Sequence, residues 1–277
     1  KVFSELSTYY HIFAVDCHGH GQSSKNPRKY TGAAIGKDFI WFIKNVIKEP
    51  VVISGHSSGG LLTAWLAANS PASVKGIVIE DAPFFSTEPG RRENTYAWLD
   101  GFQTIHEFLH QSEETDYTRF YLEHTYMQNF WGNGWDEIVM PAAEKYMSKH
   151  PGKGLRLWFL PPAMNKAFDL TRCIQNNNGS YDLRFGDTFY DDSWFKDFDQ
   201  EETLSKIQCP SVILHTVSNY DENGVLLAAM DNDDAKRAHA LLPDNELIDN
   251  IKSGHNIHDE KPDFFVDIML DFLNRIE

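Results

Sequence analysis

Cysteine, positive charge and long apolar runs are all scarce in this 277-residue sequence. The three cysteines are an odd number, have neither CxxC spacing nor the density of a disulfide scaffold, and stand at Cys17, Cys173 and Cys209. We therefore expect a reducing compartment, the cytoplasm, and no structural metal. Lysine and arginine number 25 against 40 aspartates and glutamates, and this formal net charge of −15 argues against nucleic acid as a partner. No run approaches the ~18 apolar residues of a membrane span, so no membrane partner is expected.

The apolar segments follow the rhythm of a parallel α/β fold. Short buried strands are predicted at 11–15, 51–54, 76–80, 211–215 and 246–251. Helical periodicity is found at 33–48, 61–68, near 231–242 and from Pro262 onward. Because each strand is followed by a helix or a long excursion, the sequence predicts a mostly parallel sheet with flanking helices.

This rhythm breaks between residues 84 and 202, where amphipathic pieces rich in tyrosine, tryptophan and phenylalanine replace the strands. The simplest interpretation is an α/β core of residues 1–83 and 203–277 that carries a helical cap or lid at 84–202. Aromatic residues at helical spacing are more typical of the cap's own core than of a substrate wall. Some should nevertheless face the site, because a lid excludes water with apolar groups, and this favours a moderately hydrophobic acyl or aromatic substrate.

The sequence GHSSG at 55–59 fits the pattern G-x-S-x-G, directly after one predicted strand and directly before a helix. A serine at such a sharp strand-to-helix turn is held in a strained conformation with its hydroxyl exposed. We expect Gly55 and Gly59 to be needed because side chains there would collide with the neighbouring strand and helix. We interpret Ser57 as a nucleophile and the N–H of Ser58, at the helix N-terminus, as an oxyanion donor.

A serine hydroxyl needs a base, and the base needs an orienting acid. In this architecture they should follow in the order Ser, Asp or Glu, His, at the C-terminal ends of later strands. His255, just after the strand at 246–251, is the candidate base, while His258 is more typical of a residue that supports the site, or of a surface residue, near the start of the last helix. The pair has no third ligand and no HExxH helix, so no metal is expected.

Several carboxylates are candidates for the acid that orients His255. The strand at 211–215 should deliver it, and Asp221 is our choice because it is the first carboxylate beyond that strand. Asp231 is a later candidate that is also typical of a helix start, as are its neighbours Asp233 and Asp234. Asp81 is a distinct alternative, because the strand at 76–80 also ends beside the nucleophile.

Three motifs, in order along residues 11–277, resemble those of the α/β-hydrolase superfamily. The sequence DCHGHGQS at 16–23 is similar to the family's D-x-R-G-x-G-x-S turn after its strand β4, with His18 in place of the usual Arg. The second is the nucleophile elbow at 55–59, and the third matches G-H-x-x-x-x-E-x-P at Gly254, His255, Glu260 and Pro262. The resemblance implies a cap-containing, esterase-like serine hydrolase that uses no cofactor.

The sequence departs from the family's pattern in two further places. Counted from Pro210, the family's usual acid falls on Asn219, so Asp221 is a choice between near neighbours. The family also has a strand-ending H-G motif upstream of its β4, whose loop supplies the second oxyanion N–H, and only residues 1–10 precede that strand here. We therefore expect a fragment that lacks the first strands and half of the oxyanion hole. Such a piece should be unstable, because its sheet would expose an unpaired edge.

Together these features predict a serine hydrolase that cleaves a carboxylic ester or related acyl substrate through an acyl-enzyme, with Ser57, Asp221 and His255 as its triad. The expected partner is a small molecule, and the sequence indicates no oligomeric state. One alternative is the hydrolysis of a C–C bond in a dicarbonyl compound by the same triad. Another is a non-catalytic protein that binds a small ligand under the cap, although the intact Ser–His pair argues against it.

Overall fold

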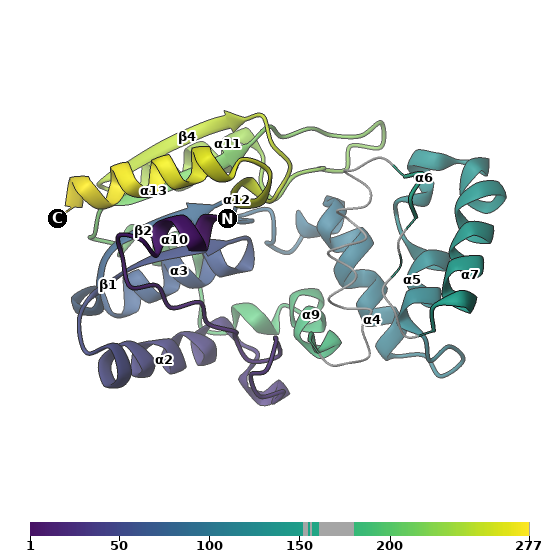
Figure 1. Ribbon diagram of the computed structural model, residues 1–277, viewed down its shortest axis with the longest axis horizontal. Coiled ribbons are helices and arrows are strands. Elements are labelled where there is room, and N and C mark those ends of the chain that lie inside the picture. The colour runs from purple at the N-terminus through teal and green to yellow at the C-terminus, as the bar shows by residue number, and fades with distance from the viewer. Residues whose placement is uncertain (152–154, 156, 161–179, 277) are drawn as a thin grey trace. The chain divides into compact units, whose positions relative to one another are not determined.

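The computed structural model describes residues 1–151, 155, 157–160 and 180–276, which form two compact units. Unit 1 comprises residues 1–15, 31–95 and 194–277, and unit 2 comprises residues 16–30 and 96–193 (Figure 1). Residues 84–95 belong to unit 1, where the Arg91 guanidinium pairs with Asp231 and Asp234. Cys173 lies outside the described residues. None of the described helices is long and apolar enough to cross a membrane.

Unit 1 is built on a parallel sheet of four strands in the order β1-β2-β3-β4 (Figure 1). The strands are β1 (Val51–His56), β2 (Val74–Glu80), β3 (Ser211–Thr216) and β4 (Asn245–Ile251). They confirm four of the five predicted strands and the predicted parallel α/β class. Because the strands run parallel, their carboxyl ends meet at one edge of the sheet, and the segments that follow them start out together.

The fifth predicted strand, at 11–15, is wrong. The segment belongs to no sheet of the described residues, and four of its five residues are exposed. Phe13 is 40% exposed and Val15 44% exposed. The run of apolar residues indicated a buried strand. A strand, however, also requires a neighbour to bond with, and a sequence pattern does not reveal one.

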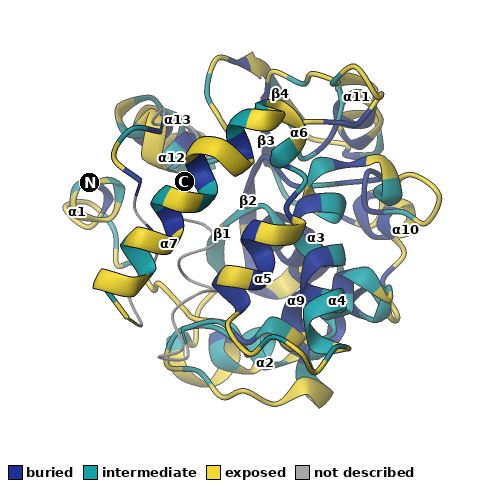
Figure 2. Ribbon diagram, turned by 90° about the vertical axis from the view of Figure 1, so that its right-hand side faces the viewer, coloured by how far each residue is buried: buried dark blue, intermediate teal, exposed yellow. Residues whose placement is uncertain are grey.

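Helices cover both faces of this sheet. On one face lies α3 (Ser58–Asn69), with α2 (Gly32–Phe42) packed against it. The opposite face is covered by the amphipathic α13 (Pro262–Ile276), along which buried and exposed residues alternate (Figure 2). Successive side chains of β2 point to opposite faces of the sheet and so contact different helices. Val78 belongs to the core under α13, whereas Ile79 approaches α3.

The remaining helices of unit 1 are short. They are α1 (Val2–Leu6), the π-helix η2 (Ile43–Ile47), the 3-10 helices η3 (Pro71–Ser73) and η4 (Arg92–Asn94), α10 (Gln200–Ser205), α11 (Asn232–Leu241) and α12 (Ile257–Glu260). A further 3-10 helix, η7 (Ser193–Phe195), spans the boundary between the two units. Helices α2 with η2, α3, α11 and α13 lie close to the predicted positions.

The described part of unit 2 consists of helices and connecting segments. They are η1 (Pro27–Lys29), η5 (Ala97–Phe102), α4 (Gln103–Leu109), α5 (Tyr117–His124), α6 (Gln128–Trp131), η6 (Trp135–Val139), α7 (Met140–Lys149) and α9 (Leu183–Tyr190). Their aromatic residues largely form the unit's own core, as expected: Tyr121 and Trp135 are 1% and 2% exposed and belong to one apolar cluster with Ile105.

The close packing of α2 on α3 yields a prediction for Gly36. A Cβ atom at Gly36 would lie 2.2 Å from the buried Trp65 ring, so Gly36→Ala should force the helices apart. We expect the free energy of unfolding to fall by about 1–3 kcal/mol, although alanine is the better helix former. Gly101→Ala is the matched control, because an added Cβ there meets nothing within 4 Å. It should leave stability unchanged or raise it by about 0.5–1 kcal/mol. Urea unfolding of both variants measures the difference, and equal effects would contradict the prediction.

Candidate active site

Ser57 stands in the sharp turn between β1 and α3 with backbone angles φ 56° and ψ −124°. A positive φ costs energy in a residue with a side chain, and such strain is concentrated at functional sites. Backbone hydrogen bonds hold the turn: the Ser57 N–H donates to the Glu80 carbonyl over 2.9 Å, and the N–H groups of Gly60 and Leu61 donate to the Ser57 carbonyl over 2.8 Å and 3.3 Å. The Ser57 side chain does not cap α3, which leaves its hydroxyl available for chemistry.

Two glycines make room for this turn, and one of them is not the one predicted. A Cβ at Gly55 would lie 2.1 Å from the Gly59 carbonyl oxygen, which confirms the need for glycine there. A Cβ at Gly59 itself would meet nothing within 4 Å, so the expectation for that position is wrong. The crowded position is Gly60, where a Cβ would lie 2.6 Å from the Ala82 Cβ. Ser58 is the first residue of α3, and N–H groups at a helix start have no partner within the helix.

The carboxylate of Asp81 lies against the candidate base. Asp81 directly follows β2, is 1% exposed and has a positive φ of 43°. Its Oδ2 is 2.8 Å from Nδ1 of His255, a residue 174 positions later in the chain. When Nδ1–H donates this hydrogen bond, the other ring nitrogen, Nε2, carries the lone pair of a neutral imidazole. Nδ1 of His255 is thus occupied by a buried carboxylate, and Nε2 remains for another partner.

Asp81 stays charged because its surroundings donate to it. Burial acts to raise the pKa of this carboxyl, but the nearby imidazoles of His215 and His255 and the Thr216 N–H outweigh it and hold the pKa below its usual range. The Thr216 N–H and hydroxyl each donate over 3.2 Å. The fully buried His215 places Nδ1 3.5 Å from Oδ1 of Asp81, and its Nε2 lies 3.1 Å from the Asn232 Oδ1.

The other candidate acids, Asp221 and Asp231 with its neighbours Asp233 and Asp234, are engaged elsewhere; Asp233 pairs with Lys236 and Asp234 with Arg91. The Asp221 carboxylate accepts N–H groups within its own turn, over 2.9 Å from Asn223 and 2.8 Å from Val225. Asp231 caps α11. The contact with His255 is made by Asp81 instead of Asp221, which corrects the preferred choice in favour of the alternative. The physical reason is the distance from the strand: Asp81 directly follows β2, whereas β3 ends at Thr216, well before Asp221.

A second carboxylate holds the loop that carries His255. Glu80, the last residue of β2, is 2% exposed and accepts the N–H of His258 over 2.8 Å and its Nδ1–H over 2.9 Å. Glu260 accepts the Gly254 N–H over 2.9 Å, which explains the spacing of the G-H-x-x-x-x-E motif. Adjacent carboxylates at the end of one buried strand thus hold both histidines of the loop, and His258 has the supporting position that was one of its two expected roles.

His56 ties the same loop to the elbow. Its Nε2 lies 2.9 Å from the His255 carbonyl oxygen, and the two ring centroids are 4.3 Å apart. Burial, followed by the nearby His255, lowers the pKa of His56 to about 4, so this ring is neutral and donates to the carbonyl. Sequence reasoning overlooked His56 and Glu80. A buried acidic residue at the end of an apolar strand, directly before Asp81, was the signal for Glu80.

The pKa of His56 yields a prediction on stability. In the unfolded chain an ordinary histidine has a pKa of about 6.5, whereas folded His56 titrates at about 4. Between these pH values the unfolded chain binds more protons, so the free energy of unfolding falls as the pH is lowered through this window. His56→Asn removes the titrating group and should flatten the slope of stability against pH between about 6.5 and 4. Urea unfolding across this range tests it. Above pH ~7 the difference in the free energy of unfolding between His56→Asn and the unmodified protein should stay constant. If His56→Asn keeps the same slope between pH values of about 6.5 and 4, the lowered pKa of His56 is contradicted.

Comparisons with known proteins identify the fold family. A family model described as the alpha/beta hydrolase fold matches residues 1–262. The (E)-2-((N-methylformamido)methylene)succinate hydrolase of Acinetobacter baylyi is 23% identical over 245 residues, which are 87% of this chain and 74% of that protein. The structure of the esterase RhEst1 from Rhodococcus sp. ECU1013 superposes with a TM-score of 0.59 at 18% identity, over 100% of this chain and 84% of that one. The enol-lactonase from Burkholderia xenovorans LB400 has a TM-score of 0.59 at 15% identity, over 98% and 84%. These structural likenesses show a shared fold, and the match to the family model shows that this chain belongs to the α/β-hydrolase fold family.

Proposed function

We propose that this chain is a serine hydrolase that cleaves a carboxylic ester or related acyl compound through an acyl-enzyme. Ser57 is the nucleophile, His255 the general base and Asp81 the acid that orients it. The observation that carries the proposal is the 2.8 Å contact between the buried Asp81 carboxylate and His255, whose loop is bonded to the residue before the strained Ser57. A hydroxyl on a sharp turn and an imidazole with one nitrogen bonded to a buried carboxylate are the parts of a serine triad.

The reaction begins when Ser57 Oγ bonds to the carbonyl carbon of the substrate and its proton passes to Nε2 of His255. The carbonyl oxygen becomes an oxyanion, for which the Ser58 N–H at the start of α3 is a donor; one such donor contributes about 3 kcal/mol. The imidazolium then returns its proton to the leaving alcohol as the acyl–oxygen bond breaks. A water molecule, deprotonated by the same ring, releases the acid and regenerates the Ser57 hydroxyl.

Electrostatics support this assignment of roles. The pKa of Asp81 lies below its usual range, so the carboxylate is charged when the imidazolium of His255 forms beside it. The lowered pKa of His56 keeps its ring neutral, with its centroid 4.3 Å from that of His255. A positive charge on His56 would oppose formation of the His255 imidazolium. The base thus has a fixed negative charge on one side and a neutral ring on the other.

The relatives support an acyl substrate. Two of the similar structures are named as an esterase and an enol-lactonase, and both names describe ester bonds. The curated relative is named for a succinate derivative with an N-methylformamido group, which is also an acyl compound. A panel of short-chain p-nitrophenyl esters, lactones and N-acyl enamines therefore separates the members of the proposed substrate class. Turnover of a dicarbonyl compound without turnover of any ester would instead assign the triad to C–C hydrolysis, and stoichiometric binding without turnover would contradict an enzyme.

Replacement of the nucleophile tests the role of Ser57. Ser57→Ala should lower p-nitrophenyl ester turnover by roughly 10⁴-fold or more and abolish covalent labelling by a fluorophosphonate. Ser58→Ala is the matched control: it removes the adjacent hydroxyl but keeps the backbone N–H, so labelling and most of the turnover should remain. Continued labelling of Ser57→Ala would remove this serine from the role.

Replacement of the acid separates the two candidate carboxylates. Asp81→Asn keeps the shape of the side chain but removes its charge and disturbs the tautomer of His255, so kcat should fall by roughly 10⁴-fold. Asp221→Asn is the matched control, because an amide oxygen can still accept the N–H groups of Asn223 and Val225; its kcat should stay within a few-fold of the unmodified protein. Esterase kinetics of both variants decide the matter, and the reverse ranking would restore Asp221 as the acid.

A further inference from the structure

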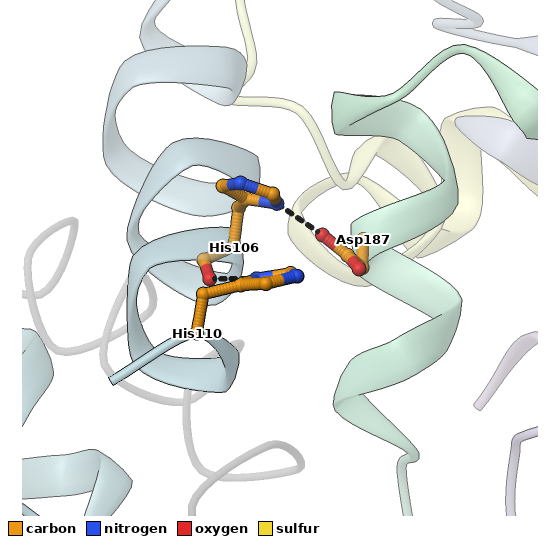
Figure 3. A group of neighbouring side chains, drawn as sticks. All are labelled: His106, His110 and Asp187. Carbon is orange, nitrogen blue, oxygen red and sulfur yellow. Dashed lines mark hydrogen bonds and ion pairs between the residues drawn. The ribbon is translucent and has the colours of Figure 1, made fainter. Parts of the chain in front are cut away.

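Three potential metal ligands gather between two helices of unit 2, whereas the triad residues belong to unit 1. His106 and His110 come from α4 and its C-terminal end, and Asp187 comes from α9 (Figure 3). Each residue offers one ligand atom, and these atoms all lie within 4.8 Å of one another. Residues four positions apart on a helix share a face, so both imidazoles are directed to the side that α9 covers.

The two hydrogen bonds of the cluster differ in what they offer an ion. Nδ1 of His110 lies 2.8 Å from the His106 carbonyl oxygen, so Nδ1–H donates to it and the lone pair is on Nε2. Metal-binding histidines commonly donate their second ring N–H to a carbonyl or carboxylate in this way. Nδ1 of His106 lies 2.8 Å from Oδ1 of Asp187. This contact brings one nitrogen and one carboxylate oxygen together across the two helices, and the proton that they share is released to solvent when both atoms bind the ion.

Neighbouring residues hold the His106 ring in place, whereas the side of the cluster formed by His110 is open to solvent. The His106 ring stacks on Tyr190, with centroids 3.7 Å apart and planes 10° apart. Its side chain is 29% exposed and that of Asp187 is 22% exposed, whereas His110 is an exposed residue. An ion can therefore enter from solvent on the side of His110. The His106 and His110 ring centroids lie 4.1 Å apart with planes 33° apart, so the exposed His110 ring must turn for both imidazoles to direct a nitrogen at the ion.

We propose that His106, His110 and Asp187 bind a zinc ion that links α4 to α9. Two imidazoles and a carboxylate suit zinc and similar transition metals, whereas magnesium and calcium prefer sites made of oxygen. Bonds of about 2.0–2.1 Å in a tetrahedral site place neighbouring ligand atoms about 3.3 Å apart. The 2.8 Å pair would open slightly and the widest separation, within 4.8 Å, would close by about 1.5 Å or less, which side-chain rotation supplies.

This site departs from the expectation that the chain binds no metal. That expectation rested on cysteine spacing and on the pair at 255 and 258, and it took no account of the HxxxH spacing at 106–110. The third ligand stands 81 residues after His106, so only the packing of α9 on α4 brings it into range. A plain His106–Asp187 ion pair, with His110 capping the end of α4, is the competing explanation of the same contacts.

Zinc titration of the full chain, produced without a histidine tag and stripped with EDTA, tests the proposal. Isothermal calorimetry should show one equivalent bound in the micromolar range, and cobalt in its place should give the visible absorption of a nitrogen- and oxygen-ligated ion. His110→Ala and Asp187→Asn should each weaken zinc binding at least about tenfold, because even loss of an outer partner costs 10- to 100-fold. One equivalent of zinc should raise the melting temperature of the unmodified protein and not that of Asp187→Asn.

His124→Ala is the matched control. His124 also stands at the end of a helix, with Nδ1 2.7 Å from the Phe120 carbonyl oxygen, but it is not a member of the cluster. Its variant should bind zinc and cobalt like the unmodified protein. Circular dichroism checks that all variants are folded. Equal affinity in His110→Ala, Asp187→Asn and the unmodified protein would place the ion elsewhere, and binding weaker than about 1 mM would leave only the ion pair; either result overturns the proposal.

Discussion

The hydrogen bond between the Asp81 carboxylate and His255 is the interaction on which the rest of the candidate site depends. A carboxylate that is 1% exposed would be costly without partners, and the hydrogen bonds from His255 and Thr216 compensate for the lost water. The pairing joins the end of β2 to a loop 174 residues later. Because the parallel sheet brings its carboxyl ends to one edge, a short loop after β4 suffices to place an imidazole there.

The neighbouring contacts all serve to hold that loop in one place. Glu80 binds His258, Glu260 binds the N–H of Gly254, and His56 binds the carbonyl of His255. Three separate groups thus fix a segment that would otherwise be free to move, and two of them stand at the ends of adjacent strands. Such support by rigid elements is what keeps a catalytic group within the narrow range of productive geometry.

Local patterns in the sequence were sufficient for the features that one segment determines by itself. The strand-turn-helix around Ser57 and the G-H-x-x-x-x-E spacing around His255 are of this kind, and both were predicted at the right residues. Features that depend on a partner far along the chain were not predicted correctly. The strand at 11–15 failed because pairing cannot be read from one strand, and Asp81 ranked below Asp221 because the reach of a loop is decided by packing. The sequence pointed to Gly59 as the position with no room for a side chain, whereas the structure has it at Gly60, because the crowding comes from Ala82, two residues after the end of β2.

A crystal structure of the protein after reaction with a fluorophosphonate, which traps a mimic of the tetrahedral intermediate, would show whether Ser57, His255 and Asp81 act together. We expect phosphorus bonded to Ser57 Oγ, a phosphonyl oxygen that accepts the Ser58 N–H, and Nδ1 of His255 still hydrogen-bonded to Asp81. Phosphorus on another residue, or a His255 ring that has turned to Asp221, would contradict it.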